Sequence, residues 1–291
     1  MAITAQAVKE LRDKTGAGMM DCKKALAESG GAVEEAIEKL RERGLAKAVK
    51  RAGRETAEGT IAIALTGNIG AMVELACETD FVAKTPEYLA LAQSLAEVLT
   101  ANPTVTSPEE FMELEDSGFK VSEAISSAAG KMGENIVVKR LARVDVAGGG
   151  LCGGYVHAGG KLGVLVGMST TEIKADISAL AKDLAMHVAA HDPSPVAIEK
   201  EGVPGQVIER ERELFRRQAL EEGKPEKVVE RIVDGRINKY FTEVCLMEQA
   251  FVKDPDRKVR DLLNEETVQN EGGMVRVTEF VRFKLGESSS Q

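Results

Sequence analysis

The order of expected elements is repeated once along this 291-residue chain, and this repeat limits the possible folds more than any other feature. The first copy consists of a β-hairpin, a helix and a late strand, at 60–65 with 69–75, at 88–99 and at 136–141. The buried face of that helix is expected to carry Leu91, Leu95 and Val98. A further helix, opened by Ser122, is expected before the late strand.

The second copy follows the same order. Its hairpin is expected at 151–157 and 162–166 around a Gly159-Gly160 turn, its helix begins near Ile177, and its late strand lies at 275–285. A sheet that is apolar on one face needs helices or another sheet to cover it. The repeat therefore predicts an α+β fold with a two-copy core, in which helices lie on one face of each antiparallel sheet.

Two charged segments with helical periodicity, 207–222 and 226–241, interrupt the second copy. Pro225, in the connection between them, suits the first turn of the second helix. We expect an inserted antiparallel helical hairpin (a coiled coil) at about 206–241, projecting ~25 Å at 1.5 Å per residue. The expected contacts between its helices are made by Val229, Val233, Ile237 and Tyr240 with Ile208, Phe215 and Ala219. An isolated two-helix projection has little core of its own, which points to a partner protein.

Three short helices are expected before residue 45. Thr4 is a good N-cap for the first, glycines separate the helices, and Gly44 is expected to end the third. The basic stretch 47–54 is interpreted as a solvated helical tether; an RNA contact is disfavoured because no aromatic residue is interleaved for stacking. We thus expect an N-terminal three-helix (UBA-like) bundle with a basic linker.

These patterns divide the chain at its changes of composition. The glycines at 148–150 form the joint between the two copies. The expected domains are the bundle and linker at 1–54, a first core subdomain at 55–147, a second at 148–287 with the helical insertion, and a polar tail at 288–291.

Charge and apolar patterning exclude several classes of protein. A net charge of −9 and a pI near 5.2 argue against direct nucleic-acid binding, which requires a basic face. No apolar run approaches the ~20 residues of a membrane span, and the start does not resemble a signal peptide. The four cysteines are far apart, without a Cys-x-x-Cys pair, as expected for reduced core thiols. We expect a soluble cytoplasmic protein.

The sequence contains no recognisable motif of an enzyme active site. Residues 148–153 fit G-x-G-x-x-G but lead into a strand, whereas a dinucleotide loop opens a helix. His187 and His191 have a metal-binding spacing without the glutamate of a zinc protease, so we favour a structural role. No serine or cysteine can be paired with a histidine, as a nucleophile with its base, from its position in the sequence. We expect no catalytic residue, no metal site, no cofactor and no small-molecule substrate.

The most informative local segment is 79–82, which contains Thr79, Asp80, Phe81 and Val82 where a buried strand is expected to run into a loop. One interpretation is that Phe81 caps the local core, as most aromatic residues do. The other is that a rigid scaffold displays the segment to a partner.

Segment 79–82 and residues 15–26, Thr-Gly-Ala-Gly-Met-Met-Asp-Cys-Lys-Lys-Ala-Leu, closely resemble the elongation factor Ts family. The resemblance covers nearly the whole chain. It implies an exchange factor that binds elongation factor Tu carrying GDP and promotes GDP release without covalent chemistry.

The resemblance also implies residue roles. Segment 79–82 would enter beside the nucleotide site of elongation factor Tu and displace its Mg²⁺. Docking on the partner is implied for residues in the N-terminal bundle and in the second hairpin: Arg12, Met19 and Met20, with Tyr155, His157, Gly159, Gly160, Lys161, Leu162 and Gly163.

Two alternatives remain at the level of the sequence. A non-enzymatic adaptor that binds another partner through its N-terminal helices would require nothing special at Asp80 and Phe81. An enzyme that acts on a small molecule is disfavoured, because the sequence shows no set of catalytic residues. Accelerated release of fluorescent GDP from elongation factor Tu would discriminate among the three.

Overall fold

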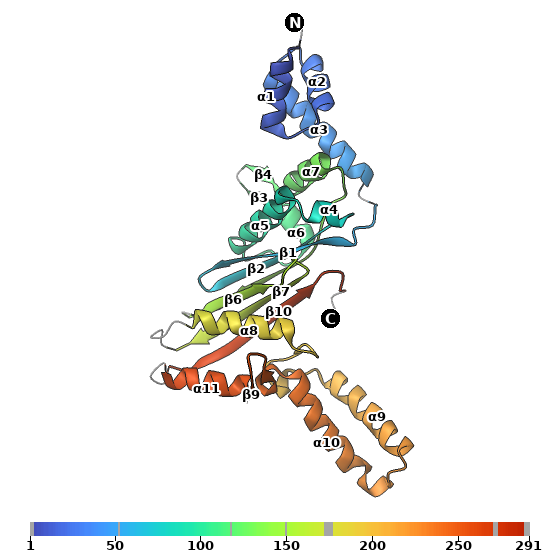
Figure 1. The fold of residues 1–291 in the computed structure, drawn as a ribbon, viewed down its shortest axis with the longest axis vertical. Helices are drawn as coiled ribbons and strands as arrows, with labels where there is room; N and C mark the ends of the chain where they lie inside the picture. Colours follow the sequence, from blue (N-terminus) through green and yellow to red (C-terminus); the bar gives the residue numbers. More distant parts are fainter. Residues whose placement is uncertain are drawn as a thin grey trace.

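A computed structural model describes residues 3–51, 53–116, 118–148, 150–171, 177–269 and 273–287. The expected tail at 288–291 lies outside these residues. Figure 1 shows an elongated arrangement, with three helices at one end, two sheets in the middle and a helical hairpin at the other end. The three helices are α1 (Ala5–Thr15), α2 (Met19–Glu28) and α3 (Val33–Arg51), and the hairpin consists of α9 (Gly205–Glu221) and α10 (Glu226–Val244).

The two central sheets have the same topology. The first contains β1 (Glu58–Thr66), β2 (Ile69–Cys77) and β5 (Val137–Asp145), and the second contains β6 (Leu151–Val156), β7 (Leu162–Thr170) and β10 (Val275–Lys284). In each, a hairpin is completed by a late strand that pairs antiparallel with the second strand of the hairpin. The mixed α and antiparallel β content agrees with the α+β class expected from the repeated pattern.

Alternation along the strands produces four layers. Ala62 and Val73 point to a core shared with α5 (Pro86–Thr100) and α7 (Val121–Met132), whereas Ile61 and Met72 point to the second sheet. On the outer face of the second sheet, Val164 and its neighbours pack with α8 (Ser178–Ala190) and α11 (Val259–Gln269). Helices therefore cover the outer faces, and the inner faces of the two sheets cover each other (Figure 1).

Glycines let the two sheets approach closely. A Cβ added at Gly163 would lie 2.5 Å from Ile61 Cγ2 and 3.0 Å from Met72 Sδ. A Cβ added at Gly70 would lie 2.3 Å from the Sγ of Cys152 in the opposite sheet. These separations are shorter than any normal carbon contact, so a side chain at either glycine would push the sheets apart.

A buried ion pair within the first sheet also contacts the second sheet. Glu74 on β2 is 3% exposed and its carboxylate lies 2.5 Å from Arg140 on β5. Arg140 donates to the backbone carbonyl of Lys284 at 2.8 Å and covers the ring of Phe283 at 4.3 Å. The Arg140 guanidinium thus ties the first sheet to the end of β10.

The N-terminal helices confirm the expected caps but not the end of α3. The Thr4 side chain accepts from the N–H of Ala7, and Gly16 ends α1 with a left-handed backbone. The expectation that Gly44 ends the third helix is wrong, because α3 continues to Arg51 and includes most of the basic stretch. A Cβ added at Gly130 on α7 would lie 3.2 Å from the Cα of Gly44, so small residues here allow α3 and α7 to pack closely.

The helical hairpin has the expected apolar seam. Val229, Val233 and Ile237 of α10 are buried with Ala219 of α9, and Ile208 and Phe215 pack against them. Pro225 is the N-cap of α10 rather than part of its first turn. Ion pairs cross between the two helices, linking Arg212 to Glu230 and Asp234, Arg216 to Glu230, and Arg236 to Glu222.

Other sequence expectations need correction. The buried face of α5 carries Tyr88, Ala92 and Leu99 beside Leu95, whereas Leu91 and Val98 are only half-buried, because the helix is rotated relative to the expected stripe. Helix α7 begins one residue before Ser122, with Lys120 at the N-cap. The short elements were not expected: α4 (Asp80–Ala83), α6 (Pro108–Met112), β3 (Glu115–Asp116), β4 (Phe119–Lys120), β8 (Ala250–Phe251), β9 (Asp254–Lys258) and two 3₁₀ turns at Lys200–Gly202 and Leu246–Glu248.

His187 has a structural position at the base of the hairpin. Its ring is fully buried; Nε2 lies 3.0 Å from Oε1 of Gln249, and Nδ1 accepts from the N–H of Val252 at 3.1 Å. The Gln249 amide in turn donates to the carbonyl of Glu243 on α10 at 2.7 Å. This chain of hydrogen bonds connects α8 to the end of α10 and requires a neutral imidazole.

Candidate protein-docking site

Segment 79–82 forms the start of the short helix α4, directly after β2, and not the loop expected from the sequence. Thr79 is the N-cap, its Oγ1 accepting from the N–H of Val82 at 3.4 Å. Val82 and Ala83 turn inward onto the core of the first sheet. Phe81 points outward and is 82% exposed, so this ring is displayed and does not cap the core.

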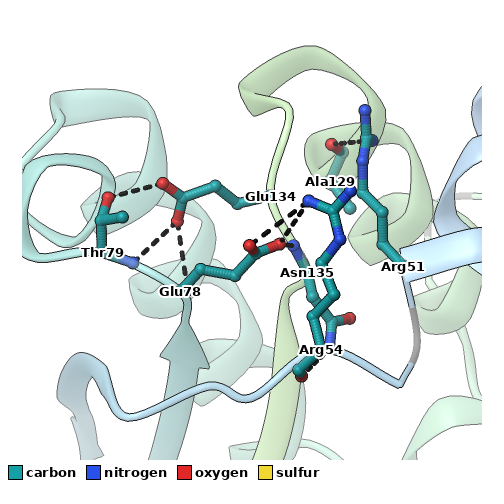
Figure 2. Close-up of polar contacts among 7 residues, drawn as sticks. All are labelled: Arg51, Arg54, Glu78, Thr79, Ala129, Glu134 and Asn135. Atoms are coloured by element: carbon teal, nitrogen blue, oxygen red, sulfur yellow. Dashed lines mark hydrogen bonds and ion pairs between the residues drawn. The ribbon is translucent and has the colours of Figure 1, made fainter.

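The base of α4 is held by one carboxylate. Oε2 of Glu134 accepts from the backbone N–H groups of Glu78 at 3.1 Å and Thr79 at 3.0 Å, and Oε1 accepts from the Thr79 hydroxyl at 2.5 Å. Figure 2 shows Glu134 reaching these groups from the loop that follows α7. The Thr79 hydroxyl thus both caps α4 and donates to Glu134, which fixes where the helix begins.

The same loop holds the end of the N-terminal tether. The Glu78 carboxylate accepts from the N–H of Asn135 at 2.7 Å and pairs with Arg54 at 3.3 Å, while the Asn135 amide donates to the Arg54 carbonyl at 3.0 Å. Arg51, the last residue of α3, donates to the carbonyl of Ala129 at 3.0 Å (Figure 2). The Asn135 N–H and the nearby Arg54 lower the pKa of Glu78 below its ordinary value.

Charged side chains of both signs lie near Asp80, the neighbour of Phe81. Lys84 donates to Asp80 at 2.6 Å and lowers the pKa of that carboxyl group, and the charge of Lys161 lowers it further. Lys161 itself pairs with Glu58 at 2.9 Å. The turn of the second hairpin therefore lies close enough to α4 to share its electrostatic environment.

The structure brings this turn against the first strand of the other sheet. The N–H of Ile61 donates to the carbonyl of Gly160 at 2.7 Å. Gly160 has a φ of +71°, and an added Cβ would lie 2.2 Å from the hydroxyl of Thr60. Both the backbone conformation and the close contact therefore require glycine at this position. Segment 79–82 and the predicted turn residues thus belong to one surface region, although they come from different sheets.

The predicted residues of the second hairpin differ in exposure. His157, Gly159 and Lys161 are exposed, and Tyr155 Oη lies 3.0 Å from Nδ1 of His157. Gly163 is buried between the sheets and Leu162 is half-buried, which indicates a packing role for Gly163.

The predicted N-terminal docking residues lie elsewhere. Met19 and Met20, at the start of α2, are 58% and 73% exposed, and Arg12 on α1 is also exposed. Their helices lie at one end of the molecule, beyond α7, and α3 runs from them toward the first sheet (Figure 1). The structure therefore presents two separate displayed surfaces.

Three residues at the base of α4 were missed by the sequence analysis: Glu134, Glu78 and Arg54. No spacing signal links Glu134 to Thr79, because they are 55 positions apart. Only the expected strand order, which brings the start of β5 beside the end of β2, could have pointed to this loop.

The fold and this site define an α+β protein that displays apolar side chains, Phe81 on α4 and Met19 and Met20 on α2, on two separate surfaces. Among the described residues, no group of three or more His, Cys, Asp or Glu side chains could hold a metal ion. All four cysteines are buried and free. Within the same described ranges, no helix is long and apolar enough to span a membrane.

A family model described as Elongation factor TS matches residues 78–287. The chain is 47% identical over 290 residues to elongation factor Ts of Chlorobium phaeobacteroides (strain BS1), covering 98% of this chain and 99% of that protein. It is 44% identical over 287 residues to elongation factor Ts of Clostridium botulinum (strain Eklund 17B, Type B), covering 98% and 93%. The chain belongs to the elongation factor Ts family and has a role in translation elongation.

Proposed function

We propose that this protein is a guanine-nucleotide exchange factor that binds elongation factor Tu·GDP in the cytoplasm and promotes release of GDP. The observation that carries the proposal is Phe81, 82% exposed on a helix whose first turn is fixed by Glu134. A large apolar ring held in water on a rigid base gains stabilisation only by entering a partner.

The proposed mechanism is displacement of Mg²⁺ by segment 79–82. In a nucleotide-binding protein, Mg²⁺ bridges the phosphates to the protein, so removal of its support weakens GDP binding. Burial of the Phe81 ring provides about 2–3 kcal/mol toward that distortion. Asp80 stays ionised beside Lys84 and opposes the phosphates or accepts from a displaced loop.

The exposed residues of α1 and α2 have a different role in this proposal. Arg12, Met19 and Met20 dock on the nucleotide-binding domain of the partner, and methionine suits a transient, adaptable contact. Tyr155, His157 and the turn residues Gly159, Gly160, Lys161 and Leu162 contact another part of the partner, while the buried Gly163 holds the turn in place by packing between the sheets. Neither set needs a cofactor, and the protein performs no covalent chemistry.

The alternative function is that of an adaptor that binds another partner through α1–α3. It provides no reason for an exposed phenylalanine beside a charged residue on α4, so the position of Phe81 favours exchange. The exposed methionines on α2 are compatible with both functions.

The direct test measures fluorescent GDP release from elongation factor Tu with and without this protein. Acceleration that saturates with protein concentration supports exchange, and binding without acceleration supports the adaptor. Thermodynamic linkage provides a second readout, since GDP must weaken the binding of the two proteins by the same factor as this protein weakens GDP.

A further inference from the structure

The loop after α7 makes contacts that the proposed docking residues do not account for. Glu134 is half-buried and is not among the proposed docking residues, yet its carboxylate accepts three hydrogen bonds at the junction of β2 and α4. Two of the donors are consecutive backbone N–H groups, and the third is the hydroxyl that caps α4. All three donors lie within three positions of Phe81.

A short helix needs such support from outside. Helix α4 has only four residues, too few to be stable through its own hydrogen bonds. Its inward residues, Val82 and Ala83, pack against the first sheet, and the Cys77 thiol donates to the Thr79 carbonyl at 3.2 Å. The three bonds to Glu134 add the contacts from outside β2 and α4 that hold the N-cap, and we infer that they set the direction in which Phe81 projects.

We propose that Glu134 is a positioning residue for nucleotide exchange, one that acts through Thr79 and sets the direction of Phe81 without touching the partner. This inference rests on the proposed exchange function. Docking through Met19 and Met20 does not depend on the direction of Phe81, so Glu134 should affect the maximal rate and leave docking unchanged.

Side-chain length, and not charge, is the property that this role requires. In Glu134→Gln, the amide oxygen can accept from both backbone N–H groups, and the amide NH₂ can donate to the Thr79 hydroxyl. In Glu134→Asp, the charge remains but the side chain is one methylene too short to reach all three groups. In Glu134→Ala, all three interactions are lost.

Stopped-flow release of fluorescent GDP from elongation factor Tu, over a concentration series of each variant, tests the proposal. We expect the maximal rate to fall about tenfold or more in Glu134→Ala, since small misplacement of a reacting group is costly. Glu134→Gln should stay within about threefold of the wild type and Glu134→Asp should lie between, with half-saturating concentrations unchanged.

Glu110 provides a matched control, because its carboxylate accepts from the N–H and the hydroxyl of Thr106 at 2.9 and 3.0 Å beside another short helix, α6. Glu110→Ala should leave the rate unchanged. The proposal is overturned if Glu134→Asp releases GDP as fast as Glu134→Gln, or if Glu134→Ala alters only the half-saturating concentration. The Asp and Gln pair keeps the test decisive should the Ala variant fail to fold.

Hydrogen–deuterium exchange of the peptide covering 78–84 separates this inference from the proposed function. We expect faster exchange in Glu134→Ala than in Glu134→Gln, whether or not elongation factor Tu is the partner. Equal exchange in the two variants would contradict the positioning role. If exchange differs but the wild type fails to accelerate GDP release, the proposed function is wrong and the anchoring of α4 stands.

Discussion

Glu134 accepts hydrogen bonds from both the backbone N–H and the hydroxyl of Thr79, 55 positions away in the chain. This contact joins the end of the first hairpin to the start of the late strand and leaves Phe81 on the outer side of α4. The displayed ring therefore stands on a base made by two segments that the sheet brings together.

We expect docking on the partner and nucleotide exchange to depend on different residues. Replacing Met19 and Met20 by alanine removes exposed side chains at the start of α2, so folding should be unaffected. We expect the half-saturating concentration for GDP release to rise about tenfold, with the maximal rate unchanged. Stopped-flow kinetics measures both quantities. A lower maximal rate with an unchanged half-saturating concentration would assign these methionines to the exchange step.

The contact between the two sheets should be sensitive to a single methyl group. In Gly163→Ala, the new Cβ would lie 2.5 Å from Ile61 Cγ2, and we expect a loss of about 1–3 kcal/mol in the free energy of unfolding. Gly235→Ala is the matched control, because an added Cβ there meets nothing within 4 Å on helix α10. That change should stabilise the protein by about 0.5–1 kcal/mol. Urea unfolding measures the free energy of unfolding of both variants. An equal change in the two would contradict the close approach of the sheets.

Acid should weaken the base of the helical hairpin through His187. Burial lowers the pKa of His187 below its ordinary value of 6.5, and the neighbouring ring of His191, 5.1 Å away, acts in the same direction. Below pH 6.5 the unfolded chain takes up a proton that the folded chain excludes, so stability falls until pH reaches the folded pKa. The slope in that window is at most about 1.4 kcal/mol per pH unit.

Urea unfolding at pH 7.5 and pH 5.5 measures this effect. His187→Gln should lose part of the difference between the two conditions. His191→Gln should retain more of it, because burial, the larger cause of the lowered pKa of His187, remains. The groups facing His187 are Gln249, the Val252 N–H, the Phe251 ring and His191, none of them a carboxylate that would stabilise the charged form. An unchanged pH dependence in His187→Gln would contradict the requirement for a neutral imidazole.

Strand alternation made the core predictable from the sequence. The two hairpins, their late strands and the apolar seam of the helical hairpin follow from short-range patterns, and the structure has them at nearly the expected positions. Other features, such as where α3 ends, depend on tertiary contacts. Gly44 was expected to end a helix, but it lies inside α3, at a close approach to Gly130 of α7 that no local pattern reveals.

The candidate site was only partly predictable for the same reason. The residues alone left open whether Phe81 caps the core or is displayed, and only the family resemblance favoured display. The helix that carries Phe81 could not be inferred, because α4 depends on hydrogen bonds to Glu134, which no local pattern reveals. The proximity of Lys161 to Asp80 likewise depends on how the two sheets pack.

The central claim is that Phe81 acts in the exchange step and not in docking. Phe81→Ala removes an exposed ring, so the free energy of unfolding should change little. Loss of a phenyl ring that is buried only in the exchange step should cost about 2–4 kcal/mol, which lowers the rate tens- to hundreds-fold. Met274→Ala, at a residue 42% exposed before β10, is the control for loss of an exposed apolar side chain.

The most direct measurement is stopped-flow release of fluorescent GDP from elongation factor Tu, over a concentration series of wild type, Phe81→Ala and Met274→Ala. We predict that Phe81→Ala lowers the maximal rate tens- to hundreds-fold with a similar half-saturating concentration, and that Met274→Ala matches the wild type. If Phe81→Ala raises only the half-saturating concentration and reaches the wild-type maximal rate, Phe81 is a docking anchor and the account is contradicted.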